Sequence, residues 1–307
     1  MKVWKAISLT GLWLMAVSAP LYGYQEVHVE NGGVLSGKVS LNGEIPKPKG
    51  YNLVTFPDPI YCGRISTGNG WRLLQPFTVD SDGGFQNVVV LLTDIEKGKK
   101  FESFTPRIQA IDCTFAPYIT IVRDHHKVEV VNMDPVMHDI QAYETSDLGA
   151  RVLFNVPLPM SERLTKNELL KKVTVKNRGG QVMTQQIKMR KGRNIFVMQC
   201  GFHAYMESWG VAVRNPYFAK TDEHGHFTMT DVPPGTYKLV VWHPYVRKTI
   251  EHTVTINPKE TTEHNIVVEA PTGRLYANEV LDHPYNRFEV TPDQQKEIDP
   301  LLKKQHH

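Results

Sequence analysis

Four residues of this chain combine imidazole and sulfur donors in a pattern suited to a single metal ion. Cys200, His203 and Met206 share the heptapeptide CGFHAYM, and His138 lies earlier in the chain. Two imidazoles, one thiolate and a weak, distant thioether form the ligand set of an electron-transfer copper centre. Soft sulfur donors favour Cu(I), whereas imidazoles also tolerate Cu(II), so one rigid site of this kind can hold both oxidation states.

The segments around these residues have the character of β-strands. Residues 194–199 precede CGFHAYM and the short apolar run 209–214 follows it, so the heptapeptide is predicted to form a loop between two neighbouring strands. His138 follows the strand-like residues 127–131 and the turn that begins at Asn132. The alternative is that a buried cysteine, a surface histidine and a core methionine occur together without binding metal, because each is common.

Residues 105–215 resemble a cupredoxin of the plastocyanin and amicyanin kind. The resemblance runs through 117–122, 128–134, CGFHAYM and 210–213, and the Cys-x₂-His-x₂-Met spacing matches the shortest ligand loops of that family. It implies a Greek-key β-sandwich that binds one copper ion and carries one electron at a time. By the same resemblance, the equatorial ligands are His138, Cys200 and His203, and the axial ligand is Met206.

The chain departs from the cupredoxin pattern at three places. Residues 145–190 form a longer connection than usual, Asp139 stands where asparagine is usual, and Gly201 stands where serine or threonine is usual. In the family, the side chains at the last two positions tie the ligand loops together. Contacts around the ligands tune metal affinity and potential, so the sequence leaves this part of the site undefined.

The segments on either side resemble a second family. Residues 37–43 (GKVSLNG), 221–227 (TDEHGHF) and 232–239 (VPPGTYKL) are similar to the carboxypeptidase regulatory-like domain, a small transthyretin-like β-sandwich. Gly225 and Gly235 fall at turn positions that favour a positive φ. That family keeps its opening strand and its later hairpin in one domain, which implies a discontinuous sandwich with the cupredoxin inserted. Two consecutive sandwiches are the alternative.

The predicted fold class is all-β, a Greek-key cupredoxin β-sandwich inserted in or joined to a second small β-sandwich. Short β-branched runs alternate with clusters of Gly, Pro, Asn and Asp, as in sandwich folds. Helices are expected at 161–172 and 292–304. The expected segments are a signal peptide at 1–23, the second sandwich at 24–104 and 216–270, the cupredoxin at 105–215, and a polar tail at 271–307.

The N-terminus has the features of a secretory signal. Lys2 and Lys5 form a charged region before the apolar stretch 6–17, which is too short to span a bilayer. Cleavage of the signal is expected near Gly23. A retained membrane anchor is the alternative. The mature protein is therefore expected to be periplasmic or secreted, with no membrane span after signal removal.

The cysteine count is informative in an oxidising compartment. The chain has three cysteines, and if Cys200 binds copper, Cys62 and Cys113 remain to form a disulfide. This bridge would join the region before the cupredoxin to the cupredoxin itself. A second metal site that combines these thiols with His125 or His126 is the alternative, although no metal-ligand spacing supports it.

Charge and motifs narrow the functional classes. The net charge of +3 is too small to favour nucleic-acid binding. No Gly-rich phosphate loop, nucleophile elbow or pair of catalytic carboxylates stands out, so the chain is not predicted to be an enzyme. The predicted function is a type 1 blue-copper protein that carries single electrons for a redox partner, such as a c-type cytochrome or a copper or quinone enzyme. A copper-handling or interaction β-sandwich protein without electron transfer is the alternative.

The redox partner is expected to bind beside a histidine ligand. Small electron carriers dock through an apolar patch around an exposed histidine, over a small interface. Phe202, Ala204 and Tyr205 flank His203 and are the residues expected in that patch.

His125 and His126 are expected in a turn between two strands, and His224 and His226 beside a hairpin glycine at the surface. His243 is expected to pack at the end of a strand, and a functional role near the junction with the copper domain is the alternative.

Overall fold

The computed structural model describes residues 23–67, 70–145, 149–160, 180–246 and 248–280. The predicted signal peptide up to residue 22 and both predicted helices, 161–172 and 292–304, lie outside these residues. Among the residues described, β-strands are joined by loops with one short α-helix, α1 (Pro59–Cys62), and two 3₁₀ turns, so the predicted all-β class is confirmed. No helix in this part of the chain is long and apolar enough to span a membrane.

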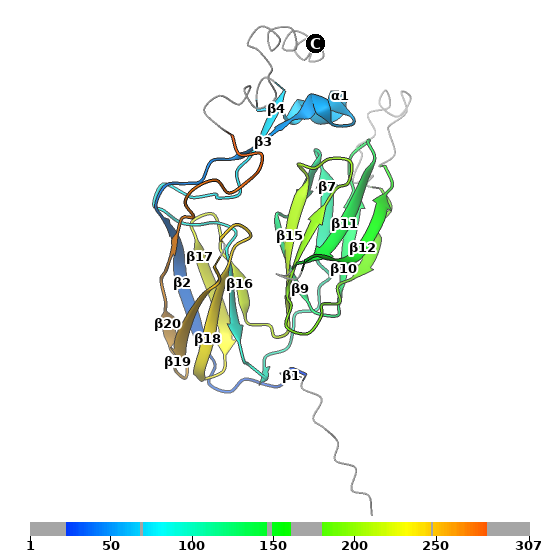
Figure 1. Cartoon of the computed structure of the whole chain (residues 1–307). Helices are drawn as coiled ribbons and strands as arrows, with labels where there is room; N and C mark the ends of the chain where they lie inside the picture. The colour runs from blue at the N-terminus through cyan, green and yellow to red at the C-terminus, as the bar shows by residue number, and fades with distance from the viewer. Residues whose placement is uncertain (1–22, 68–69, 146–148, 161–179, 247, 281–307) are drawn as a thin grey trace, which may run out of the picture.

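The first sandwich packs a five-stranded sheet against a four-stranded one (Figure 1). The larger sheet has the order β12 (Arg151–Leu158), β11 (His138–Glu144), β14 (Ile195–Gln199), β15 (Glu207–Val213) and β9 (Ile119–Arg123). The smaller sheet has the order β13 (Met183–Gln186), β10 (Lys127–Asn132), β7 (Arg107–Ile111) and β8 (Thr114–Ala116). Ile108 and Val130 of the smaller sheet share one core with Ile140 and Phe196 of the larger sheet.

The second sandwich is formed by strands from both sides of the first in sequence. One sheet has the order β16 (Phe218–Lys220), β5 (Val89–Thr93), β18 (Gly235–Trp242) and β19 (Ile250–Ile256). The other has the order β17 (His226–Val232), β2 (Gly33–Asn42) and β20 (Thr261–Glu263), and β21 (Ile266–Glu269) also pairs with β2. Two short strands, β1 (Gln25–Glu26) and β6 (Lys97–Gly98), pair with each other. The predicted domain boundaries themselves stay a prediction.

One hairpin requires a glycine for a steric reason. Gly225 has a φ of +78° in the turn that enters β17. A Cβ atom there would lie 2.4 Å from the carbonyl oxygen of Val39 and 2.7 Å from the amide nitrogen of Phe85. Both contacts are to backbone atoms and cannot be relieved by a rotamer change. The prediction that Gly225 lies at a turn position with a positive φ is therefore confirmed, and a larger residue would not fit there.

A segment between two short strands covers one end of the first sandwich. The strands β3 (Lys49–Asn52) and β4 (Trp71–Leu74) pair with each other, and the chain between them contains α1. Figure 1 shows α1 beyond the end of the strands of the first sandwich. We call residues 53–66 the strap. The strap is tied to the turn between β7 and β8 by the predicted disulfide, Cys62–Cys113, with a Cα–Cα distance of 5.6 Å.

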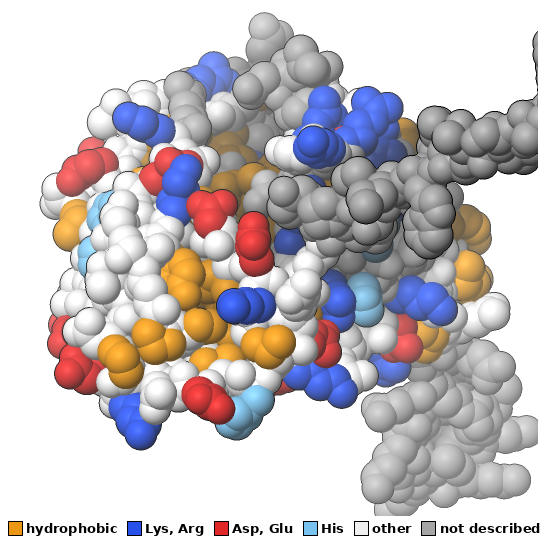
Figure 2. Space-filling view, turned by 90° about the horizontal axis from the view of Figure 1, so that it is seen from below, with side chains coloured by type: hydrophobic (Ala, Val, Ile, Leu, Met, Phe, Trp, Pro, Cys, Tyr) orange, Lys and Arg blue, Asp and Glu red, His pale blue; other side chains and the backbone are white. Residues whose placement is uncertain are grey.

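The two sandwiches meet through a shared apolar cluster. In β5, Val90 and Leu92 face the core of the second sandwich, whereas Val89 and Leu91 face the junction. Trp242 lies in the same junction cluster, together with residues from β9 and β15 of the first sandwich. On the face seen in Figure 2, side chains of both charges are interspersed, in keeping with the small net charge.

Candidate metal centre

The alternation of side chains along two strands places two of the three donors on the buried side. In β11, His138 is in phase with the buried Ile140 and Ala142. Along β14, Phe196 and Met198 are buried, and Cys200 continues the same phase just beyond the end of the strand. Because side chains on a strand repeat with a period of two, the hydrophobic pattern itself directs His138 and Cys200 inward.

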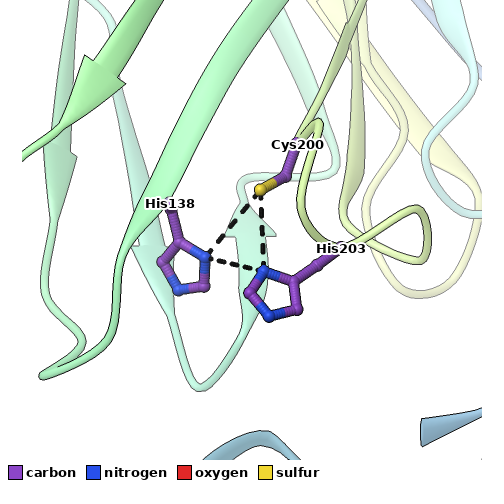
Figure 3. A group of neighbouring side chains, drawn as sticks. All are labelled: His138, Cys200 and His203. Atoms are coloured by element: carbon purple, nitrogen blue, oxygen red, sulfur yellow. Dashed lines mark hydrogen bonds between the residues drawn. The ribbon is translucent and has the colours of Figure 1, made fainter. Parts of the chain in front are cut away.

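The loop between β14 and β15 brings the third donor to the same point. His138 Nδ1 lies 3.2 Å from His203 Nδ1, and the sulfur of Cys200 lies 3.9 Å from the first nitrogen and 3.7 Å from the second (Figure 3). All three side chains are buried, and their donor atoms are close enough together to hold one metal ion. The loop is closed by hydrogen bonds from Met206 N to His203 O and from Cys200 N to Met206 O.

Both imidazoles are held with their inner nitrogens free to bind a metal. His138 Nε2 lies 2.9 Å from Asp134 Oδ2, and His203 Nε2 lies 3.1 Å from the carbonyl oxygen of Pro57. Each oxygen can only accept, so each Nε2 carries the proton and each Nδ1 presents a lone pair. Two lone pairs that face each other across 3.2 Å repel, and a cation between them removes that repulsion.

The separations also fit the bond lengths of a metal ion. Imidazole and thiolate ligands bind at about 2.0 and about 2.3 Å, so a trigonal ion would separate two nitrogens by about 3.5 Å and each nitrogen from the sulfur by about 3.7 Å. The three distances above agree with these values to within a few tenths of an ångström. Met206 is fully buried in the same core as Cys200, and its axial role stays a prediction.

Burial sets the protonation of the metal-free donors. Burial, together with the neighbouring His138, lowers the pKa of His203, which favours the neutral imidazole that a metal requires. Burial also raises the pKa of the Cys200 thiol to about 11. A metal ion must therefore displace the thiol proton when it binds, as is usual for cysteine ligands.

A second set of donors lies beside the first. Cys113, Asp134 and His138 also have potential ligand atoms close together. The sulfur of Cys113 is already bonded to Cys62, so it is not free to bind metal. Burial alone would raise the pKa of Asp134, but hydrogen bonds from His138, two backbone amides and Tyr61 lower it, so this carboxyl group is ionised. The alternative site, which combined the thiols of Cys62 and Cys113 with His125 or His126, is wrong, because the two sulfur atoms are bonded to each other. Both histidines are exposed in the turn between β9 and β10.

Two of the three departures from the cupredoxin pattern, Asp139 and Gly201, compensate each other. The carboxylate of Asp139 accepts a hydrogen bond from the backbone amide of Gly201, so it joins the two ligand loops without the usual side chain at position 201. A Cβ at Gly201 would lie 2.4 Å from Gln141 Nε2 and 2.9 Å from Asp139 Oδ2. The glycine therefore makes room for the aspartate, and the connection that the sequence left undefined is present.

The strap buries the histidine that was expected to be exposed. His203 has no exposed surface, because Pro57 accepts its hydrogen bond and the sulfur of Cys62 lies 3.9 Å from its Nε2. Tyr205 is also buried, and its ring packs edge-on against that of Phe56. The predicted apolar patch around an exposed ligand is therefore wrong for His203 and Tyr205.

The outer edge of the ligand loop remains at the surface. Phe202 is 43% exposed and Ala204 is also exposed, so these two residues stay candidates for contact with a partner. His243 lies among core residues of the second sandwich. It packs between Phe77 and Phe85, and burial lowers its pKa to about 3, so the prediction of a packed aromatic residue is confirmed.

Sequence reasoning missed two contributors to the centre, Asp134 and the strap. Asp134 lies four residues before His138, within a segment already recognised as part of the ligand turn, so its spacing was an available signal. For Pro57 and Tyr61 there was no such signal, because their partners lie far away in sequence. Only Cys62, through its predicted disulfide, indicated that this region approaches the centre.

Comparison with known proteins adds three findings. Residues 204–264, which include the strands β15 to β20, match the family model described as polysaccharide lyase family 4, domain II. The predicted resemblance to a carboxypeptidase regulatory-like domain therefore stays a prediction. No curated protein matches this chain.

Several solved structures similar to this chain are cupredoxins. A purple cupredoxin from Nitrosopumilus maritimus is 15% identical, with a TM-score of 0.25, over 35% of this chain and 99% of its own. Auracyanin A from Chloroflexus aurantiacus is 10% identical, with a TM-score of 0.25, over 36% of this chain and 98% of its own. A copper-containing nitrite reductase from Thermus scotoductus is 15% identical, with a TM-score of 0.25, over 38% of this chain and 24% of its own. Similarities of this size do not bear on function, which has to be argued from the donor atoms.

Proposed function

We propose that this chain is a type 1 blue-copper protein that carries single electrons between redox partners. The supporting observation is the triangle of His138 Nδ1, His203 Nδ1 and Cys200 Sγ, in which both outer ring nitrogens already donate hydrogen bonds elsewhere. Copper bound there would supply a one-electron Cu(II)/Cu(I) couple. Met206, buried in the same core, is proposed as the weak axial ligand.

The residues of the chain would keep the centre rigid in both oxidation states. Asp134 and the Pro57 carbonyl fix the two imidazole rings, and the Asp139 carboxylate holds the ligand loop through Gly201. The strap excludes water from His203. A site that neither gains a ligand nor moves one loses little energy to rearrangement when an electron is exchanged.

Optical and spin-resonance spectra of the copper-loaded mature protein test this proposal. We expect an intense thiolate-to-copper absorption, one copper ion per chain and a reversible potential. Cys200→Ala removes the thiolate and should abolish the colour. Met189→Leu is the matched control, because it removes a buried sulfur atom in the same core that is not a proposed ligand, and it should keep the colour. An intensely coloured Cys200→Ala protein would contradict the model.

The burial of His203 favours one alternative, a copper-handling protein. A strap that covers the ligand edge suits retention of the ion more than rapid exchange of electrons with a large partner. This alternative predicts tight binding of Cu(I) without intense colour in the oxidised protein and without a reversible potential. The same spectra and a voltammogram therefore separate the two functions.

The remaining parts of the proposal concern location, partner and the second sandwich. The Cys62–Cys113 disulfide is typical of an oxidising compartment, which supports a periplasmic or secreted protein. The proposed partner is a redox protein, such as a c-type cytochrome or a copper or quinone enzyme, and the chain itself is not proposed to be an enzyme. The second sandwich is proposed to be a regulatory-like domain that presents the first.

A further inference from the structure

One buried carboxylate connects a proposed copper ligand with the strap. Asp134 is 1% exposed. Its Oδ2 accepts hydrogen bonds from His138 Nε2 at 2.9 Å and from Cys113 N at 2.8 Å. Its Oδ1 accepts from Asp112 N at 2.8 Å and from the hydroxyl of Tyr61, in the strap, at 3.0 Å. All four sites on the two oxygens are therefore used.

We propose that Asp134 is a positioning residue for His138 and that Tyr61 of the strap moderates the charge of Asp134. The two side chains should then shift the reduction potential of the copper centre in opposite directions. This inference rests on the proposed copper function and deepens it. It assigns to the strap a role in tuning the site, in addition to covering His203.

The first part follows from the charge next to the ring. Among the described residues, the four donors to Asp134 are a histidine ring, a phenol and two backbone amides, and none is a lysine or arginine. The carboxylate charge is therefore shared with His138 rather than cancelled. A carboxylate that accepts from the outer nitrogen of a histidine ligand fixes its tautomer and makes it a stronger donor. A stronger donor stabilises Cu(II) more than Cu(I), so Asp134 should lower the potential.

The second part follows from the competing hydrogen bond. The Tyr61 hydroxyl withdraws electron density from the carboxylate, which leaves less for His138. Arg64 strengthens this effect, because its guanidinium group donates to the Tyr61 oxygen and lies 3.7 Å from the centre of the ring. Removal of the hydroxyl would return that density to His138. Tyr61 should therefore raise the potential, by less than Asp134 lowers it.

The two imidazoles differ in the charge of the group that accepts their outer hydrogen bond. The outer nitrogen of His138 donates to the buried carboxylate of Asp134. That of His203 donates to the neutral carbonyl of Pro57, and the nearest carboxylate oxygen, on the exposed Asp58, lies 4.0 Å away. A change at Asp134 should therefore affect His138 and leave the hydrogen bond of His203 unchanged. This difference gives the experiment an internal reference within the same site.

Voltammetry of two variants beside the wild type tests the proposal. In Asp134→Asn, the affinity for Cu(II) should fall about tenfold relative to that for Cu(I), which raises a one-electron potential by about 59 mV. In Tyr61→Phe, the potential should fall by a smaller amount. Tyr237→Phe is the control, because it removes a hydroxyl that donates to Pro233 O in the second sandwich, and it should leave the potential unchanged. Shifts of the same sign in the first two variants would overturn the proposal.

A measurement on the metal-free protein keeps the test independent of copper. Nitrogen NMR should show His138 protonated at Nε2 in the wild type and in Tyr61→Phe. In Asp134→Asn, the His138 tautomer should redistribute while that of His203 stays at Nε2. If the wild type binds no copper, the proposed function fails, and the tautomers alone decide the positioning role. An unchanged His138 tautomer in Asp134→Asn would overturn that role.

Discussion

Met206 is the softest and most weakly bound of the four proposed ligands, so it should tune the centre more than hold it. Its side chain is buried in the core that surrounds Cys200, where it can act as a distant thioether donor or as simple packing. These two roles differ in their consequences. An axial donor changes the relative stability of Cu(II) and Cu(I), whereas a packing residue changes only the stability of the fold.

Substitution of Met206 separates these roles. In Met206→Gln, a harder oxygen donor favours Cu(II), so the potential should fall. In Met206→Leu, a trigonal apolar site favours Cu(I), so the potential should rise. Both variants should still bind copper through His138, Cys200 and His203. Voltammetry decides the matter, and shifts in the same direction, or no shift in either variant, would exclude Met206 as the axial ligand.

The pairing of Asp139 with Gly201 gives a second prediction at the scale of residues. Gly201→Ser should push the Asp139 carboxylate off the Gly201 amide and cost about 1 kcal/mol of stability, with faster loss of copper to a chelator. The double variant Gly201→Ser/Asp139→Asn restores the combination usual in cupredoxins and should recover part of the loss. Thermal unfolding of both variants checks this, and additive effects of the two substitutions would contradict the proposed coupling.

The residues of the centre show what sequence can predict about a site. The four proposed ligands could be selected because their types and spacing form a pattern. The contact between Asp139 and Gly201 could not, because it replaces two side chains by one side chain and one backbone amide. A backbone donor leaves no trace in the sequence. The role of Asp134 lies between these cases, since its position before His138 is visible but its burial is not.

Among the elements, the strands were predictable and the strap was not. Alternating burial in β11 and an apolar run in β5, covered on both faces, are direct consequences of residue pattern. The strap has no such period. Its position depends on contacts such as those of Pro57 with His203 and of Cys62 with Cys113, which join residues far apart in the chain.

The disulfide of the strap gives a prediction at this scale. Cys62 and Cys113 are 51 residues apart, so the chain-entropy model assigns the bridge about 4 kcal/mol of stabilisation. Cys62→Ser/Cys113→Ser should lose a comparable amount and release copper to a chelator faster, because the strap over His203 is no longer tethered. Reduction of the wild type with a dithiol should have the same two effects. The double variant should not respond to the dithiol. If it does respond, loss of the bridge is not the cause of the lower stability and the faster release of copper.

A buried carboxylate at the opposite end of β11 from His138 gives a pH-dependent prediction. Burial alone would raise the pKa of Glu144, but hydrogen bonds from Arg151, Arg190 N and Arg193 lower it to about 2. A carboxyl group whose pKa is lowered by folding stabilises the folded state at every pH above its ordinary pKa of 4.5. This contribution to stability is lost as the pH falls from 4.5 towards about 2.

Glu144→Gln should therefore destabilise the protein at neutral pH by roughly 3 kcal/mol, because two arginines lose their partner. The difference from the wild type should shrink as the pH falls from 4.5 to about 2. Chemical denaturation at a series of pH values measures both quantities. A difference that stays constant over this range would show that the charge of Glu144 is not what stabilises the fold.

At the scale of the whole molecule, the pair of strands β3 and β4, which flank the strap, and the two sandwiches meet at one buried ion pair. Lys49 of β3 lies 2.6 Å from Glu207, the first residue of β15, and donates to the hydroxyl of Tyr245 in the second sandwich. Tyr245 in turn donates to the other oxygen of Glu207 at 2.6 Å. Since Glu207 follows Met206 directly, this junction adjoins the proposed copper centre. The three parts should therefore unfold together.

Lys49→Met tests that coupling. It leaves the Glu207 carboxylate buried without a cation, which should cost about 3–5 kcal/mol. The double variant Lys49→Met/Glu207→Gln should recover much of this loss, because no unpaired charge remains. The control is Lys238→Met, which breaks the exposed Lys238–Glu251 pair and should cost less than about 1 kcal/mol. Denaturation followed by the amide NMR signals of β18 and β19, in the second sandwich, and by the copper absorption should give coincident transitions in the wild type. If the colour is lost well before these amide signals change, the metal centre and the second sandwich are independent, and the junction does not unite them.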